Sequence, residues 1–315
     1  MSHDEVLVEP LLPTDAAEAA TMLLAAERAI DGELVDEAER RRLLRYAEGD
    51  RDRAPGWRPL AARRGSELVG YGGLVLPDRS GGGAVGDAAP LPDAAPRNEV
   101  LTALFAALEA LAQEGDAGTL EVWLRRADAA DLALAARHGL PPGRRVAVLG
   151  RDLPVDAASP AAPQDVTIRA YLPERDDEQV VDVLQGAYAG TDDGGWELGA
   201  FRERRGWDWF RAEDLLVAEA GDGLLLGLHW LKRRGETVGE VHNLAIHPRG
   251  QGRGLGAALL RAGLDHLTAV GCREVVLWVD RANDRAVRLY ERQGFTTRWE
   301  DVALRRTLGG GTDRS

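Results

Sequence analysis

Residues 247–260, HPRGQGRGLGAALL, place four glycines and several basic side chains in a predicted turn directly before a helix. Backbone N–H groups at the start of a helix carry a partial positive charge and can bind a phosphate or another anion. Gly254 and Gly256 would let the backbone approach an anion closely, and Arg253 could add a charge-assisted hydrogen bond. The pattern matches neither the Walker loop, which ends in Gly-Lys-Ser/Thr, nor the dinucleotide fingerprint. It predicts a local anion site.

The elements around this loop are predicted to be strands and helices. Residues 239–248, GEVHNLAIHP, alternate in polarity and are typical of a strand. Residues 256–271 have apolar residues at helical spacing. A second strand–helix unit follows over 277–295, LWVDRANDRAVRLYERQGF. The glycine loop is therefore predicted to join a strand to a helix, so that free backbone N–H groups point at a ligand.

The chain as a whole is acidic. It has 315 residues, enough for about two domains, and a net charge of −13. This charge argues against nucleic acid as a partner, because phosphate contacts need a basic surface. Cys272 is the only cysteine, which excludes an intramolecular disulfide, and Lys232 is the only lysine. With no signal-type segment and no run of about 18 apolar residues, we expect a cytoplasmic protein without membrane contact.

The two halves of the sequence resemble each other. Residues 122–140 align without gaps to 277–295, which brings Trp123 onto Trp278. An internal duplication is the simplest explanation. The glycine loop has no counterpart in the first half, and Tyr290 falls on an alanine there. If the loop and Tyr290 do chemistry, only the second half is predicted to be active.

These motifs carry a resemblance to a known family. The loop from Gln251 to Gly256 after a strand, with residues 283–295 on the next strand–helix unit, closely resembles the GCN5-related N-acetyltransferase (GNAT) superfamily. In that superfamily the loop binds the pyrophosphate of acetyl-CoA. The resemblance is strong over about 166–308 and extends to 1–152 through the internal repeat.

A narrower resemblance is to the mycothiol synthases, which acetylate the cysteinyl amine of Cys-GlcN-Ins. It rests on the Gly-Gly pair before Trp196, the Arg-Arg-Gly before Trp207, and the His-Trp-x-Lys run that ends at Lys232. The resemblance implies an α/β (α+β) fold of two tandem GNAT-like domains, each a mixed, mostly antiparallel twisted sheet flanked by helices. The implied parts are a degenerate, non-catalytic domain over 1–152, an Ala/Pro-rich linker over 153–165, a catalytic domain over 166–308 and a disordered tail over 309–315.

The resemblance also implies acetyl-CoA as cosubstrate and no metal. The backbone of residues 244–246 would face the pantetheine arm and the acetyl oxygen, an oxyanion-type contact. The residues implied to bind acetyl-CoA are Leu244, Ala245, Ile246, Gln251, Gly252, Arg253, Gly254, Leu255, Gly256, Ala257, Asn283 and Arg288.

Two side chains are implied to move protons during acetyl transfer. The amine must lose a proton before it attacks, and the departing CoA thiolate must gain one. Since a cysteinyl α-amine titrates near pH ~8, a weak base acting through water suffices, and the resemblance makes Glu240 the candidate. Tyr290, seven residues after Asn283, is the candidate acid, because a phenol can protonate a thiolate.

For the acceptor, the resemblance points to side chains from both halves of the chain. The residues implied to bind the acceptor are Glu37, Asp192, Lys232, Glu240 and Trp278. The alignment around Glu37 is ambiguous by one residue, so Asp36 is the alternative.

Two residues depart from the mycothiol synthase pattern. That pattern usually has a tyrosine where this chain has Trp278, and an aromatic residue where this chain has His242. His242 is expected on the cleft side of its strand, where it could serve as a second base or simply pack. Both departures put the exact acceptor in doubt more than the acetyl transfer.

Two other functions stay open at this point. One is a tandem acetyltransferase that acts on another small amine, such as an antibiotic, an amino acid or a polyamine. The other is a non-catalytic acetyl-CoA-binding protein, which Glu240, Tyr290 and the intact loop argue against. Because two domains already form a pseudo-dimer, we expect a monomer.

Overall fold

A computed structural model describes residues 5–30, 32–49, 55–155, 162–191 and 194–308, and it contains two compact units. Unit 1 comprises residues 1–147, 280–282 and 299–315, and unit 2 comprises residues 148–279 and 283–298. The tail predicted over 309–315 and part of the predicted linker lie outside the described residues.

Unit 1 is a sheet with helices packed on it. Its strands follow the order β1-β2-β3-β4-β5-β12. Only β4 and β5 pair in parallel among the registers described within this unit. Its elements are β1 (Val6–Pro10), α1 (Ala16–Ala29), α2 (Glu37–Ala47), β2 (Trp57–Arg64), β3 (Glu67–Val75), β4 (Gly83–Pro90), α3 (Arg97–Glu114), β5 (Thr119–Leu124) and α4 (Ala129–Arg137).

Unit 2 repeats this plan. Its strands follow the order β11-β10-β9-β8-β7, and β10 pairs with β11 in parallel while β7, β8, β9 and β10 pair antiparallel. Its elements are β7 (Val166–Ala170), α5 (Asp177–Ala187), α6 (Leu198–Arg205), η2 (Ala212–Asp214), β8 (Leu215–Ala220), β9 (Leu225–Arg234), β10 (Val238–Ile246), η3 (Pro248–Gly250), α7 (Leu255–Ala269), β11 (Glu274–Asp280) and α8 (Asp284–Arg292). The predicted fold class, mixed and mostly antiparallel, is confirmed.

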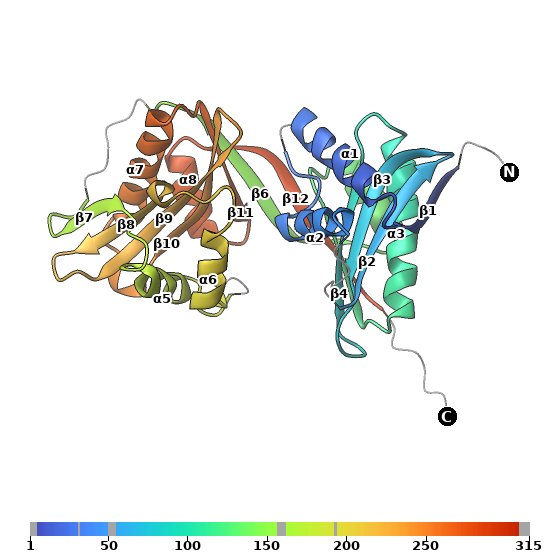
Figure 1. Cartoon of the computed structure of the whole chain (residues 1–315), viewed down its shortest axis with the longest axis horizontal. Helices are drawn as coiled ribbons and strands as arrows, with labels where there is room; N and C mark the ends of the chain where they lie inside the picture. The colour runs from blue at the N-terminus through green and yellow to red at the C-terminus, as the bar shows by residue number, and fades with distance from the viewer. Residues whose placement is uncertain (1–4, 31, 50–54, 156–161, 192–193, 309–315) are drawn as a thin grey trace. The chain divides into compact units, whose positions relative to one another are not determined.

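Side-chain alternation along β9 assigns the two faces of the unit 2 sheet. Leu228 and Trp230 pack with α5 and α6 in one core cluster. His229, between them in sequence, reaches the opposite face and hydrogen-bonds the Leu259 carbonyl of α7. Figure 1 shows α7 on one side of these strands and α5 and α6 on the other. Lys232, two residues beyond Trp230, therefore belongs to the α5–α6 face.

The last strand of each half of the sequence contributes to the other unit. β6 (Pro142–Asp152) stands next to β11, and its residues 148–152 belong to unit 2. Residues 299–307 of β12 (Thr296–Thr307) belong to unit 1, where β12 pairs antiparallel with β5. The domain bounds 1–152 and 166–308 stay a prediction about the sequence repeat, whereas the compact units are not continuous in sequence.

Candidate active site

The glycine loop connects β10 to α7 as predicted. Gly252 and Gly254 have φ angles of 76° and 77°, in the left-handed region that glycine adopts at little cost. Gly254 is the N-cap of α7 and provides no capping side chain, so the first N–H groups of the helix have no intrahelical acceptor. A Cβ added at either glycine would meet nothing within 4 Å. The loop therefore presents backbone donors beside open space, as an anion site requires.

Two predicted loop side chains already have partners. Arg253 donates to both carboxylate oxygens of Asp165, at 2.6 and 2.7 Å. The Gln251 side chain donates to the Ile246 carbonyl at 3.5 Å and accepts from Arg285 of α8 at 3.3 Å. A pyrophosphate bound at this loop would compete with Asp165 for the Arg253 guanidinium.

The strands β10 and β11 part next to the loop. Their parallel register covers Val238 to Glu240 on β10 and, in the described chain, ends at the pair Glu240–Val276 although β10 continues to Ile246. Beyond this point residues 243–246 are paired with β9 on their other side. No described register pairs residues 244–246 with β11, and the contact of their backbone with a ligand stays a prediction of the family resemblance.

A β-bulge at His242 marks the same place. The β9–β10 register runs from Val241–Leu231 directly to Asn243–Trp230, which leaves His242 as the extra residue. Bulges commonly redirect side chains beside active sites. Here the bulge follows Glu240 by two residues, so both side chains belong to the α5–α6 face of the sheet.

Six side chains from four segments form one continuous set of contacts on this face, which we call the acceptor cluster. Lys232 Nζ lies 4.8 Å from the Trp209 ring centroid, and the Trp209 and His242 centroids are 4.9 Å apart. His242 Nδ1 is 3.0 Å from Glu240 Oε1. Arg234 Nη1 donates to Glu240 Oε2 at 2.9 Å and stacks on Trp278, 5.0 Å from the centroid. The members are Trp209, Lys232, Arg234, Glu240, His242 and Trp278.

Glu240 is a buried but fully ionised carboxylate within this cluster. Burial by itself raises the pKa of Glu240. The hydrogen bond from His242 and the positive charge of Arg234 outweigh burial and hold the pKa of the carboxyl at about 2. Glu240 is therefore an anion throughout the physiological pH range and a weak proton acceptor by itself.

Tyr290 lies on α8 and is buried against Phe295, with ring centroids 5.6 Å apart. Burial, with a smaller contribution from nearby Tyr188, raises the pKa of the Tyr290 phenol well above its usual value. The phenol is thus kept protonated, the form that a proton donor needs. The Tyr188 hydroxyl in turn donates to the Asn243 side chain of β10 at 3.2 Å, which connects this region to the bulge.

The remaining predicted cofactor residues lie at the start of α7 and α8. Asn283 is the N-cap of α8, and its side chain accepts from the Ala286 N–H at 3.1 Å, which leaves its amide hydrogens to donate. Arg288 is exposed and pairs with Asp284 one turn earlier, at 3.4 Å. Leu255 is buried, so only its backbone can face a ligand, whereas Gly256 and Ala257 are half-buried in the same turn.

Two predicted acceptor residues are not brought to this cluster by any described contact. Glu37 begins α2 in unit 1 and pairs with Arg41 at 3.6 Å, while Asp36 caps the same helix. Asp192 lies outside the described residues. Both remain predictions.

Sequence reasoning missed Trp209 and Arg234. Arg234 had a usable signal, because it follows Lys232 by two positions on one strand and so shares its face. Trp209 lies in an irregular segment after α6, and no periodicity connects it to β10. Cys272, between α7 and β11, is buried.

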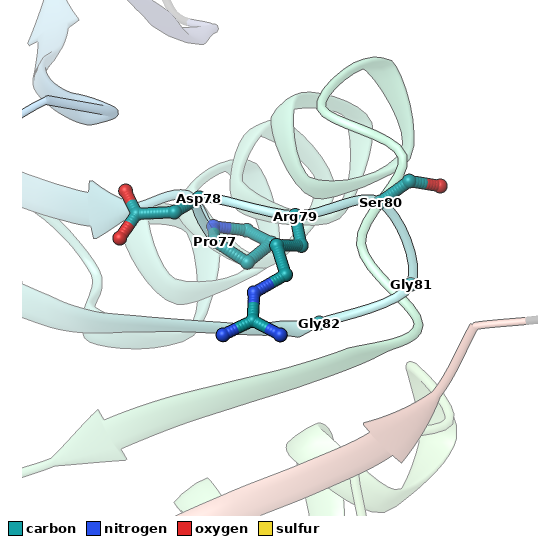
Figure 2. Close-up of a pocket in the computed structure, with 6 residues that line it drawn as sticks. All are labelled: Pro77, Asp78, Arg79, Ser80, Gly81 and Gly82. Atoms are coloured by element: carbon teal, nitrogen blue, oxygen red, sulfur yellow. The ribbon is translucent and has the colours of Figure 1, made fainter.

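No group of three or more His, Cys, Asp or Glu side chains is arranged to hold a metal ion in the described ranges. None of the helices found there is long and apolar enough to span a membrane. A surface pocket on the turn between β3 and β4, lined by Pro77 to Gly82, includes none of the predicted site residues (Figure 2).

Comparison with known proteins identifies the family. The Acetyltransferase (GNAT) family matches residues 179–295, the segment that contains the loop and the acceptor cluster. A mycothiol acetyltransferase from Actinosynnema mirum is 37% identical over 292 residues, which cover 92% of this chain and 95% of the relative. The chain belongs to the mycothiol acetyltransferase family. A second member, from Stackebrandtia nassauensis, is 35% identical and covers 93% of this chain and 97% of its own length. The protein is therefore an N-acetyltransferase, and GNAT acetyltransferases use acetyl-CoA as cosubstrate.

Solved structures support the tandem fold. A GCN5-related N-acetyltransferase from Sphaerobacter thermophilus superposes with a TM-score of 0.69 at 23% identity, covering 96% of this chain and 95% of the other. A tandem GNAT protein from the clavulanic acid biosynthesis pathway has the same TM-score at 19% identity, covering 97% and 99%. The predicted family and the predicted fold are both confirmed.

Proposed function

We propose that this member of the mycothiol acetyltransferase family transfers the acetyl group of acetyl-CoA to the cysteinyl amine of Cys-GlcN-Ins. The observation that carries the proposal is the junction at Glu240. There β10 and β11 part, the anion loop lies at the far end of β10, and the charged acceptor cluster lies on the α5–α6 face. A ligand that places pyrophosphate on the loop and its thioester at the junction would meet the cluster.

The proposed reaction uses two proton carriers. The ammonium group of the acceptor first gives one proton to Glu240 or to a side chain in contact with it. The free amine then attacks the thioester carbon. A C–N bond forms, the C–S bond breaks, and the CoA thiolate takes the proton of the Tyr290 phenol. The phenolate then recovers the second proton of the new nitrogen, so that amide, CoA thiol and one released proton are the products.

The loop and its neighbours are proposed to hold acetyl-CoA. The N–H groups from Gly252 to Ala257 would bind the pyrophosphate, with Gln251 and Arg253 at its edge and Asn283 and Arg288 near the start of α8. The backbone of residues 244–246 would bind the pantetheine arm and the thioester oxygen. No step of this scheme calls for a metal.

The acceptor cluster is proposed to bind Cys-GlcN-Ins, with Lys232 and Trp278 as its outer members. Polyols and sugars are held by charged hydrogen-bond partners and by the faces of aromatic rings. Lys232 on Trp209 and Arg234 on Trp278 supply both. Glu37 and Asp192 are kept as candidate acceptor ligands.

Unit 1 is proposed to be non-catalytic. Its strands β4 and β5 stay in register through Asp87–Trp123. Trp123 aligns with Trp278, so this pairing extends two residues past the point where β10 and β11 part. The link from β4 to α3 also lacks the glycine loop, and α3 begins after Pro96. We infer a cytoplasmic monomer in which unit 2 performs the chemistry.

The test mixes purified protein with acetyl-CoA and Cys-GlcN-Ins and follows the acceptor by mass spectrometry. Thiol dyes are unsuitable, because the acceptor carries a thiol of its own. Gain of one acetyl group on nitrogen at low acceptor concentration is expected. Bound acetyl-CoA without acetylated Cys-GlcN-Ins would overturn the acceptor and move the enzyme to another small amine, with the Trp278 and His242 departures as the first cause to examine.

A further inference from the structure

His242 is one of two residues of the acceptor cluster that depart from the family pattern, and it lies on β10 beside Glu240. It occupies the bulge of β10, two residues after Glu240, which is the last β10 residue in register with β11 in the described chain. Its ring is held by edge contacts with Trp209 and Trp230, at centroid distances of 4.9 and 5.3 Å. The ring is thus positioned by packing before any ligand binds.

The hydrogen bond to Glu240 determines which ring nitrogen carries the proton. His242 Nδ1 lies 3.0 Å from Glu240 Oε1. The carboxylate is ionised and can only accept, so Nδ1 must donate. In the neutral imidazole Nε2 then carries the lone pair, which is the tautomer of a general base.

His242 Nε2 has no hydrogen-bond partner among the described residues, although it is buried. The Trp230 indole N–H, in the ring that contacts His242, is a second buried polar atom without a partner in the described ranges. Buried polar atoms are nearly always paired, and an exception at a reaction site indicates capacity for a ligand group. The lone pair of Nε2 requires a hydrogen-bond donor. The ammonium group of the molecule that is to be acetylated is such a donor.

We propose that His242 Nε2 takes the proton from the attacking ammonium and that the Glu240 carboxylate orients the ring. This inference rests on the proposed function and assigns an atom to its first step. Glu240 remains in the proton path, as the partner that fixes the tautomer and stabilises the imidazolium. A carboxylate held at so low a pKa as Glu240 is a poor acceptor for the proton of an amine that titrates near pH ~8.

Atoms and charge balance in this step. One ammonium N–H bond breaks, the proton moves to Nε2, and the imidazolium carries the positive charge next to the Glu240 anion. The free amine then attacks the thioester. The imidazolium later gives its proton to solvent, which accounts for the one proton released per turnover.

The experiment compares His242→Phe and His242→Ala with the wild-type enzyme. Phenylalanine keeps a ring between Trp209 and Trp230 but has no lone pair. We expect kcat to fall by about 10²–10⁴-fold in both variants, while calorimetry finds unchanged acetyl-CoA binding. Imidazole added to the His242→Ala variant should raise its kcat at least about tenfold. Loss of packing alone would not produce this response.

His229→Ala is the matched control. It removes another buried histidine whose Nε2 lacks a partner among the described residues, but His229 lies on the α7 face. A lower Tm, a kcat within about twofold of wild type and no response to imidazole are expected. A His242→Phe enzyme at the wild-type rate, or a His242→Ala enzyme that imidazole does not rescue, would overturn the inference and return the role to Glu240 through water.

A second measurement is independent of the acceptor. Long-range 15N NMR of the histidine rings at pH 7.5 should assign His242 as the Nδ1–H tautomer, and Glu240→Gln should disturb that signal alone. An Nε2–H tautomer contradicts the inference even if Cys-GlcN-Ins is never acetylated. Failure of wild-type turnover with the expected tautomer would instead count against the proposed acceptor.

Discussion

The phenol of Tyr290 gains its proposed role from where it is buried. Its pKa lies above the usual value because burial disfavours the phenolate. Burial keeps the phenol protonated, so that it is in the form that can donate to the departing sulfur as negative charge develops there. Glu240 and Tyr290 are thus two titratable groups with opposite protonation states: their surroundings keep Glu240 ionised and Tyr290 protonated.

Tyr290→Phe tests this duty. We expect kcat to fall by about 10²-fold or more, because the thiolate must leave without a proton donor. Acetyl-CoA affinity, measured by calorimetry, should stay within about threefold. A Tyr290→Phe enzyme with wild-type kcat would exclude the phenol as the acid.

Glu240→Gln removes the charge that orients His242. We expect kcat to fall by at least about tenfold, since the imidazolium loses its anionic partner, while acetyl-CoA still binds. Steady-state kinetics with a binding titration on the same preparation checks both. Turnover as fast as wild type with normal acetyl-CoA binding would remove Glu240 from the proton path altogether.

His229 predicts a pH dependence of stability. Burial lowers the pKa of His229 from about 6.5 to about 4, so the unfolded chain binds the extra proton first. Stability from this group is complete above pH ~6.5 and is lost as the pH falls to ~4, by about 3 kcal/mol. Urea unfolding at pH 7 and pH 5 should show a smaller pH effect in His229→Ala. An equal pH effect in both proteins would contradict this assignment.

At the scale of elements, α7 joins the anion loop to the sheet. Its buried face, with Leu255 and Leu259 in a core cluster, fixes where the helix begins, and Gly254 allows the chain to enter that start. The loop conformation and the position of the free N–H groups are therefore coupled.

Gly254→Ala should weaken acetyl-CoA binding by about tenfold. The left-handed conformation costs a non-glycine residue about 1–2 kcal/mol, and a loop that relaxes away from it misplaces the N–H donors. Gly65→Ala is the control, because Gly65 has a φ of 60° with nothing near its added Cβ, in a turn of unit 1. We expect both variants to lose a similar amount of Tm. Only Gly254→Ala should change the affinity for acetyl-CoA. Equal affinities would show that this loop does not hold the cosubstrate.

At the scale of the whole molecule, the C-terminal strand stabilises the N-terminal unit. Val302, Leu304 and Leu308 are buried in the unit 1 core, although they end the second half of the sequence. Asp301, also buried, accepts from the Arg126 backbone N–H at 3.0 Å. Cutting the chain at the predicted linker would therefore separate each unit from residues that complete it.

Leu304→Ala tests this exchange. Loss of a fully buried leucine should destabilise unit 1 by about 2–5 kcal/mol. Hydrogen exchange followed by mass spectrometry should show lost protection in α3 and β5, with β9 and β10 unchanged. Lost protection confined to α7 and β10 instead would contradict the assignment of β12 to unit 1.

Local patterns predicted the loop and its flanking elements well. The strand expected over 239–248 is β10, the helix expected over 256–271 is α7, and the family followed from motifs between residues 194 and 295. Each of these depends on neighbours in sequence: alternation, helical spacing, and glycine where φ is positive.

What the sequence by itself determined is the chemistry: an anion loop, a tyrosine on the helix of the next strand–helix unit, a strand with an acid two residues before a histidine, and membership of an acetyltransferase family. The tertiary structure alone decided which partners those residues have. Trp209 against His242, Arg253 on Asp165, and β12 beside β5 join segments 33, 88 and more than 170 residues apart. Such contacts depend on how sheet faces pack and on where strands part, which no local period encodes.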